Sequence, residues 1–178
     1  MELLFGNHTN REVQYYELEE CLSGEKNLEA LLISLSPELL EGAFVFCTLK
    51  GATYGDHVAV SPIASSIASF TEAEGLTLVV NKKVADRLGY DYSGVFKCIR
   101  LQVHSSLAAV GLTATVIRKL SQHGISANVM AVYFHDHVFI PVKCAQQALE
   151  LLVELSGQSC GKQQVSQKIL SSDWQSVV

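Results

Sequence analysis

The second half of the chain carries the clearest alternation of hydrophobic and polar residues. Ile99, Leu101 and Val103 alternate with more polar neighbours, which predicts a half-buried strand. Two short apolar runs, Ala127–Phe134 and Val138–Val142, predict two further strands. Apolar residues also recur at helical spacing in two sets, namely Ala109, Leu112, Val116 and Leu120, then Ala145, Ala148, Leu149, Leu152 and Leu155.

The order of these elements is strand, helix, strand, strand, helix. One more strand would complete the β-α-β-β-α-β arrangement of a ferredoxin-like fold, so we predict an α+β protein of that class. The missing strand is expected from the first half, where Ala43–Lys50 is apolar on both faces and is the best candidate. Such a donation would interlock the two halves of the chain.

The first half begins with a leucine stripe. Apolar residues at i, i+3, i+4 and i+7 predict a helix with Asn27 as its N-cap; they are Leu28, Leu31, Leu32 and Leu35. Ser36-Pro37-Glu38 then predicts a fresh helix start, because proline is favoured at the first helical position.

A hairpin and a short helix complete the first half. Ser69–Glu72 and Leu76–Val80 predict the hairpin, and Lys82–Leu88 predicts the helix, with Asn81 as its cap and Gly89 as its stop. We therefore divide the chain into an acidic N-terminal arm (1–26), a first half (27–95), a second half (96–156) and a C-terminal tail (157–178).

The net charge of −5 is unevenly distributed. Residues 1–42 contain nine Glu against Arg11 and Lys26, a net charge of −7, so the rest of the chain is weakly positive at +2. A weakly charged body offers no surface that follows a phosphate backbone. We therefore expect no nucleic-acid partner.

The five cysteines are odd in number, widely spaced and without a C-x-x-C pair, which favours a reducing compartment. The chain starts without a basic segment and a long apolar core, so we predict no signal peptide. No apolar stretch approaches the roughly 20 residues of a membrane span. The expected location is the cytoplasm, with no membrane contact.

The segment His104-Ser105-Ser106-Leu107 is our first candidate site. It follows the predicted strand, and one of its serines is predicted to cap the next helix. A helix N-terminus presents unpaired N–H groups that suit an anion such as an amino-acid carboxylate, and Gly111 would let a ligand approach closely. The alternative is that the serine only caps the helix and the histidine bonds to the backbone.

Two other polar groups are weaker candidates. His135-Asp136-His137 carries side chains that suit zinc, but no third or fourth ligand is evident and Asp is common in hairpin turns. We therefore predict a tight structural turn without a metal, with ligand or interface contact as the alternative. Glu72 and Glu74 flank a predicted hairpin turn, where they are either solvated or grip the amino group of a ligand.

Catalytic signatures are not found in the sequence. It contains no G-x-S-x-G, P-loop, G-x-G-x-x-G or H-E-x-x-H motif. It also supplies no recognisable pair of base and nucleophile. We therefore predict a protein that is not an enzyme and needs no cofactor, with a group-transfer enzyme using His104 as the remote alternative.

Four runs of the chain stand out, namely EAEGLTLVV (72–80), VHSSLAAVGLTA (103–114), GISANV (124–129) and HDHVFIP (135–141). Together they resemble a group of short, stand-alone bacterial ACT-domain proteins with tandem ACT-like halves. The similarity covers roughly residues 27–155 and extends more distantly to the ACT halves of aspartate kinase and of the cytosolic arginine sensor of animals. The chain departs from this pattern at Ala108 and Val132, where an acidic residue and a glycine are usual.

The resemblance implies a regulatory module that binds an amino acid between paired ACT domains. In ACT domains the turn at His104–Leu107 forms one wall of the ligand site, and the strand starting near Asn128 forms another. The resemblance therefore extends the expected ligand contacts to Gly111, Leu112, Asn128 and Met130. A homo-dimer or tetramer is expected, and a ligand-free assembly module is the alternative function.

Overall fold

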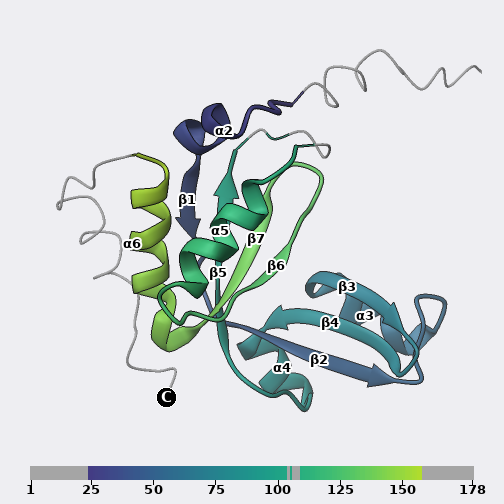
Figure 1. Ribbon diagram of the computed structural model, residues 1–178. Helices are drawn as coiled ribbons and strands as arrows, with labels where there is room; N and C mark the ends of the chain where they lie inside the picture. The colour runs from purple at the N-terminus through teal and green to yellow at the C-terminus, as the bar shows by residue number, and fades with distance from the viewer. Residues whose placement is uncertain (1–23, 104, 106–108, 158–178) are drawn as a thin grey trace, which may run out of the picture.

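The computed structural model describes residues 24–103, 105 and 109–157 (Figure 1). The elements in chain order are α2 (Leu28–Ser34), β1 (Ser36–Leu39), β2 (Phe44–Lys50), α3 (His57–Ala64), β3 (Ser66–Glu72), β4 (Gly75–Asn81), α4 (Lys82–Leu88), β5 (Phe96–Gln102), α5 (Leu112–Ser121), β6 (Asn128–Met130), β7 (Asp136–Pro141), the single 3-10 turn η1 (Val142–Cys144) and α6 (Ala145–Leu155).

The strands form one antiparallel sheet, which is shared by two structural units, one from each half of the chain. In the first unit the strands are β2, β3, β4 and β5, and their order in the sheet is β5-β2-β4-β3. In the second unit they are β5, β6, β7 and β1, and their order is β1-β5-β7-β6. Both units thus have the same ferredoxin-like strand order, and the predicted α+β class is confirmed.

The two units are interlocked, as the sequence suggested, but through a different strand. Strand β1 completes the second unit by pairing with β5, from Ser36 opposite Gln102 to Leu39 opposite Ile99. The predicted donor, Ala43–Lys50, forms β2 of the first unit and meets β5 only at the pair Phe44 and Phe96. Strand β5 is therefore the last strand of one unit and the first of the other.

The predicted helix start at Ser36-Pro37-Glu38 is wrong, because these residues belong to β1. The residue before a proline is driven toward extended backbone. On β1, which has a partner on one side only, Pro37 needs no N–H donor for the outer side. Helix α3 (His57–Ala64) was not predicted, because a turn-rich approach and Pro62 within it conceal the helical pattern.

Local signals were more reliable elsewhere. The Asn27 side chain accepts a hydrogen bond from the N–H of Ala30 at the start of α2. Asn81 does the same for Lys83 at the start of α4, and Gly89 ends that helix in the left-handed conformation with a φ of 69°. The predicted caps and stop are thus confirmed, since each depends only on neighbouring residues.

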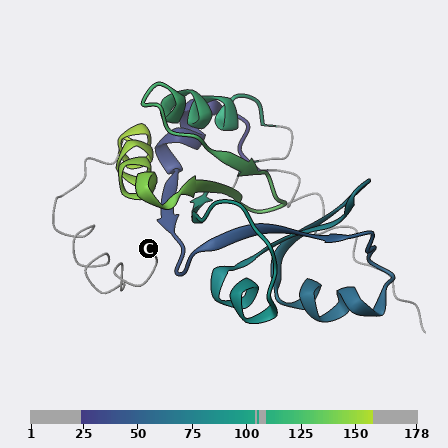
Figure 2. The ribbon, with the colours of Figure 1, turned by 90° about the horizontal axis from the view of Figure 1, so that it is seen from below.

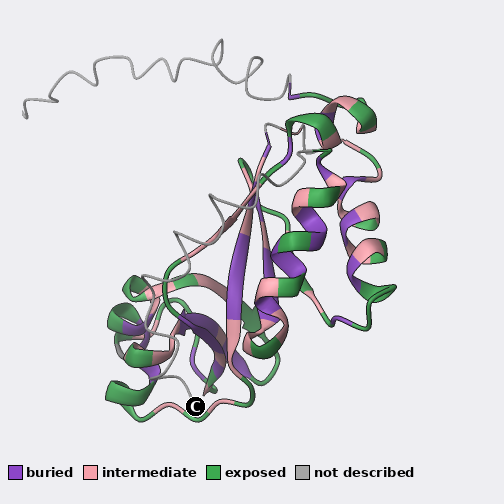
Figure 3. Cartoon of the chain, turned by 90° about the vertical axis from the view of Figure 1, so that its left-hand side faces the viewer, coloured by how far each residue is buried: buried purple, intermediate pink, exposed green. Residues whose placement is uncertain are grey.

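Two apolar cores lie under the helices (Figure 3). The core of the second unit joins α2, α5 and α6 to one face of β5 and β7, with Leu101, Leu120 and Leu152 fully buried. The smaller core of the first unit joins β2 and β4 to α3 and α4 around Leu76 and Leu78. Each sheet segment is therefore covered by helices on one face.

A third, aromatic cluster lies on the opposite face of the sheet, where the two units meet. Phe46 of β2 packs edge-on against Phe139 of β7, with ring centroids 5.3 Å apart, although β5 separates their strands in the sheet. This face therefore bends toward itself. Figure 2 shows the result, with α5 and α6 on one outer side, α3 and α4 on the other, and the strands between them.

Burial on both faces explains the behaviour of β5. Cys98 faces the aromatic cluster and Ile99 faces the core under the helices, and both are fully buried. The predicted half-buried pattern is therefore confirmed from Ile99 to Gln102, where Arg100 and Gln102 are partly exposed, and is wrong at Cys98. Burial raises the pKa of the Cys98 thiol to about 12. Cys98 therefore stays protonated near neutral pH and packs as a small hydrophobic residue.

Candidate functional site

The turn between β5 and α5 differs from the prediction at its helical end. Helix α5 begins at Leu112, and the residue before it, Gly111, has a φ of 102° in the left-handed region. A residue in that conformation cannot continue a helix backward, so the prediction that Ser105 or Ser106 caps the helix is wrong. Ser105 instead forms an isolated parallel bridge with Glu25.

The first candidate site is therefore only partly placed by the structure. His104, Ser106 and Leu107 lie outside the described residues, and their proposed ligand contacts stay predictions. Ser105 is half-buried. A Cβ atom at Gly111 would lie 3.2 Å from Leu28, so this glycine permits the close approach of α2.

Leu112 and Met130 pack within the protein. Leu112 is 3% exposed in the core of the second unit, and Met130 packs against the aromatic cluster at the joint of the two units. Asn128 is exposed at the start of β6, opposite Phe139 of β7. Of these three residues, Asn128 alone has an exposed polar side chain, which lies on the same face of the sheet as Phe139.

Asp136 does not lie in a turn. The predicted turn at His135-Asp136-His137 is wrong, because β7 begins at Asp136, which pairs with Leu101 of β5. The connection between β6 and β7 instead runs through residues 131–135. Because directly paired residues share one face of a sheet, the Asp136 side chain lies on the same side as Leu101, toward α5.

The Asp136 carboxylate is the most distinctive group at this end of the second unit. It is 8% exposed, and its Oδ2 atom accepts a hydrogen bond from the Thr113 hydroxyl, in the first turn of α5, at 3.2 Å. Burial raises the pKa of Asp136, while the hydrogen bonds from Thr113 and from the N–H of Val132 act in the opposite direction. A buried carboxylate is thus held at the start of a helix, beside the β5–α5 turn.

The two neighbouring histidines point elsewhere. The Nδ1 atom of His137 lies 3.1 Å from the backbone oxygen of His135, and burial lowers the pKa of His137. The Nδ1 atom of His135 is buried and, within the part of the chain that the structure describes, has no hydrogen-bond partner. Among the described residues no three His, Cys, Asp or Glu side chains gather to hold a metal ion.

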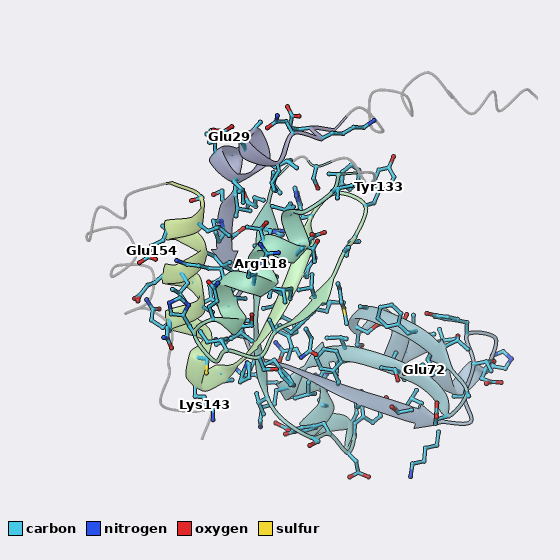
Figure 4. All side chains as sticks on the ribbon, viewed as in Figure 1. Glu29, Glu72, Arg118, Tyr133, Lys143 and Glu154 are labelled. Atoms are coloured by element: carbon cyan, nitrogen blue, oxygen red, sulfur yellow. The ribbon has the colours of Figure 1, made fainter. Side chains whose placement is uncertain are left out.

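Glu72 and Glu74 belong to the other unit. They lie at the hairpin between β3 and β4, and both are exposed. Glu72 accepts a hydrogen bond from the Thr77 hydroxyl. Figure 4 shows Glu72 far from Tyr133, which lies in the loop beside Asp136, so the structure does not bring the two sets of candidate carboxylates together.

Sequence reasoning missed a polar row on the helix-free face of the second unit. This polar row consists of Glu38, Arg100, Gln102 and His137. Glu38, Arg100 and His137 are cross-strand partners on β1, β5 and β7. Glu38 was misassigned to a helix, so the alternation of Arg100 and Gln102 along β5 was the only signal that could have revealed the row.

Glu38, on the edge strand β1, is the shared acceptor of the polar row. Its carboxylate accepts from the Arg100 Nη2 atom at 2.6 Å and from the Gln102 amide. The Arg100 and Glu38 side chains are about one-third exposed, at 35% and 32%. The Nε atom of Arg100 is buried, and within the described residues it has no partner.

The sequence matches the ACT domain family twice, over residues 23–97 and over residues 95–154. The chain belongs to the ACT-domain family. It carries two ACT domains in tandem, and ACT domains are typically regulatory modules that bind ligands. Within residues 24–157, as far as they are described, no helix is long and apolar enough to cross a membrane.

Solved structures show the same arrangement. A Vibrio cholerae protein of unknown function, described as a possible transport protein, is 49% identical with a TM-score of 0.63, and the match covers 74% of this chain and 97% of that one. An Agrobacterium tumefaciens protein is 18% identical with a TM-score of 0.54, covering 68% and 89%.

The regulatory subunit of aspartate kinase from Thermus thermophilus, in a ligand-free form, is 11% identical with a TM-score of 0.51, covering 68% of this chain and 98% of that subunit. At this identity the similarity concerns the fold alone. A comparison with curated proteins finds no match.

Proposed function

We propose that this tandem ACT-domain protein is a non-catalytic regulatory module that binds an amino acid at an interface between ACT domains. The observation that carries the proposal is the buried Asp136 carboxylate, held by Thr113 at the start of α5. A buried carboxylate is unfavourable unless it is paired, and groups with such perturbed pKa values concentrate at functional sites.

The chemistry of an amino acid matches this corner of the second ACT domain. A carboxylate offers about four acceptor positions, so Asp136 can receive an α-ammonium group in addition to the Thr113 hydroxyl and the Val132 N–H. Asn128 pairs with Phe139 and therefore lies on the opposite face of the sheet, so the structure does not bring it to the Asp136 carboxylate. His104, Ser105, Ser106 and Leu107 are proposed as the opposite wall, by analogy with the ligand site of other ACT domains.

A thermal-shift panel tests the proposal. The full chain is heated with each of the twenty amino acids at millimolar concentration. A bound amino acid at 100 times its Kd adds about 2.7 kcal/mol to the free energy of unfolding, which raises the midpoint measurably. The proposal fails if no amino acid raises the midpoint.

Self-association is the second candidate function, favoured by one observation. Val132, Tyr133 and Phe134, in the loop after the edge strand β6, are 50%, 39% and 54% exposed. Consecutive exposed apolar residues beside a sheet edge mark a surface that another chain can cover. Sedimentation of the wild-type chain and of Phe134→Asp tests this function, with a dimer or tetramer expected for the first and a smaller species for the second. A wild-type monomer at high concentration contradicts it.

A further inference from the structure

We propose that the polar row on the helix-free face of the second ACT domain is a second binding site, which takes an organic carboxylate with an apolar body. In the structure, the Glu38 carboxylate occupies the position that we propose for the carboxylate of the ligand. This site is distinct from the Asp136 corner, because Asp136 faces α5 whereas His137, the next residue of β7, faces the opposite side of the sheet.

The donors of the polar row converge on a carboxylate. Arg100 and Gln102 both donate to the Glu38 carboxylate, although they come from β5 and Glu38 from β1. Arginine recognises carboxylates through paired N–H donors. The structure therefore shows two side chains already arranged to bind a carboxylate, with an internal one in place.

One donor of Arg100 is left unused in this arrangement. The buried Nε atom has no partner within the described residues, which is unfavourable for a polar group. A carboxylate that replaces Glu38 and binds the guanidinium in a bidentate manner would satisfy it. Because Glu38 and Arg100 are each about one-third exposed, the exchange is open to a ligand from solvent.

The surroundings define the rest of the ligand. Cys98 lies two residues before Arg100 on β5, and Phe139 lies two residues after His137 on β7. Both side chains are therefore on the same face as the polar row, and both belong to the aromatic cluster. Phe46 and Met130 also line the cluster and are partly exposed. Cys98 and Phe139 are fully buried, so the apolar side chains that a ligand can reach are Phe46 and Met130, and Met130 pairs with His137 of the polar row. The ligand class therefore combines a carboxylate with an aliphatic or aromatic body.

The test uses hexanoate as the probe, measured by calorimetric titration on the full chain, with acetate and hexylamine as comparisons. Hexanoate is expected to bind more tightly than acetate, which lacks the apolar body, and than hexylamine, which has the wrong charge. Arg100→Gln is expected to weaken hexanoate binding roughly tenfold or more, the effect of losing a charge-assisted hydrogen bond. Glu38→Gln is expected to act in the opposite direction and strengthen it, because the internal competitor loses its charge.

The opposite effects of the two variants separate a binding site from a structural ion pair. If both variants change hexanoate affinity in the same direction, or if the wild-type chain does not bind hexanoate, the proposal is overturned. Arg100→Lys, which keeps the charge but not the planar donors, is expected to bind more weakly than wild type and covers the case in which Arg100→Gln does not fold. Glu154→Gln, which opens the Lys119–Glu154 ion pair on the helix side, is the matched control and is expected to leave hexanoate binding unchanged (Figure 4).

Discussion

The two ACT domains share one strand order but differ in how much they bury. Helices α3 and α4 of the first domain have 8 and 7 residues, whereas α5 and α6 of the second have 10 and 11. Among the described residues the core of the first domain contains eight buried apolar side chains and that of the second contains sixteen. The comparison indicates that the second domain supplies most of the stability, and the proposed ligand sites are built on it.

The interlock makes this asymmetry a property of the whole chain. The core of the second domain depends on residues from the first half of the chain. These are strand β1 and the buried Leu31 and Leu35, all of which come before β2 in the sequence. The larger core therefore cannot be assembled from the second half of the sequence alone. Four predictions test the comparison, from the largest expected effect to the smallest.

Isolating the second half should abolish its fold. A chain of residues 96–157 lacks β1 and two fully buried leucines, each of which contributes about 1.5–3 kcal/mol, against a total stability of about 5–15 kcal/mol for a typical protein. Circular dichroism should show an unfolded chain. Residues 24–157, which retain every described element, should fold, and a cooperative thermal transition in the isolated 96–157 chain would contradict the interlock.

Matched leucines should distinguish the two cores. Leu101→Ala in the second domain and Leu78→Ala in the first both empty fully buried positions, and such changes cost about 2–5 kcal/mol. We expect Leu101→Ala at the upper end of that range, because the larger core with longer helices can collapse less around the cavity. Urea unfolding measures both, and a larger loss for Leu78→Ala would reverse the proposed ranking.

The two asparagine caps should act alike despite the asymmetry. Asn27 and Asn81 each accept one backbone N–H at 3.0 Å, at α2 and at α4. Replacing either by Ala should cost about 1 kcal/mol, the usual value of a lost cap. Equal shifts of the urea midpoint would show that both helices unfold together with the rest, whereas no shift for Asn81→Ala would indicate that α4 opens separately.

Asp136→Asn should change the pH dependence of stability. Because the pKa of Asp136 is raised in the folded state, its favourable contribution is present below about pH 4, the ordinary value, and is lost as pH rises through the folded pKa. The stability of Asp136→Asn relative to wild type should therefore improve as the pH rises above about 4. Thermal unfolding at a series of pH values measures this difference, and a constant difference contradicts the assigned burial of the carboxylate.

The sequence predicted the features that depend on residues close in sequence, but not those that depend on strands distant in sequence. The caps at Asn27 and Asn81 follow from single side chains, and the stripe on α6 follows from helical spacing. Strand β1 is stable only because β5 lies beside it, and four residues with a proline show no strand pattern of their own. The prediction therefore found the fold but assigned the wrong strand to the interlock.

The candidate sites follow the same division. The left-handed Gly111 moved the start of α5 away from the serines. Unlike Gly89, which follows a clear helical stripe, Gly111 lies within one, so the pattern did not indicate its left-handed conformation. Asp136 was noticed for its side chain but placed in a turn, because its burial depends on the packing of α5 against β7. The polar row could not be assembled before β1, β5 and β7 were known to be neighbours.

The most direct test of the central claim is calorimetric titration with the amino acid that most raises the thermal midpoint. Wild type is expected to bind it at a defined site, and Asp136→Asn is expected to weaken binding roughly tenfold or more, because a charged partner of the ammonium group is lost. Glu72→Gln, in the first domain, is expected to bind as wild type does. Unchanged affinity in Asp136→Asn, or a loss confined to Glu72→Gln, would contradict the assignment of the ligand site to the second domain.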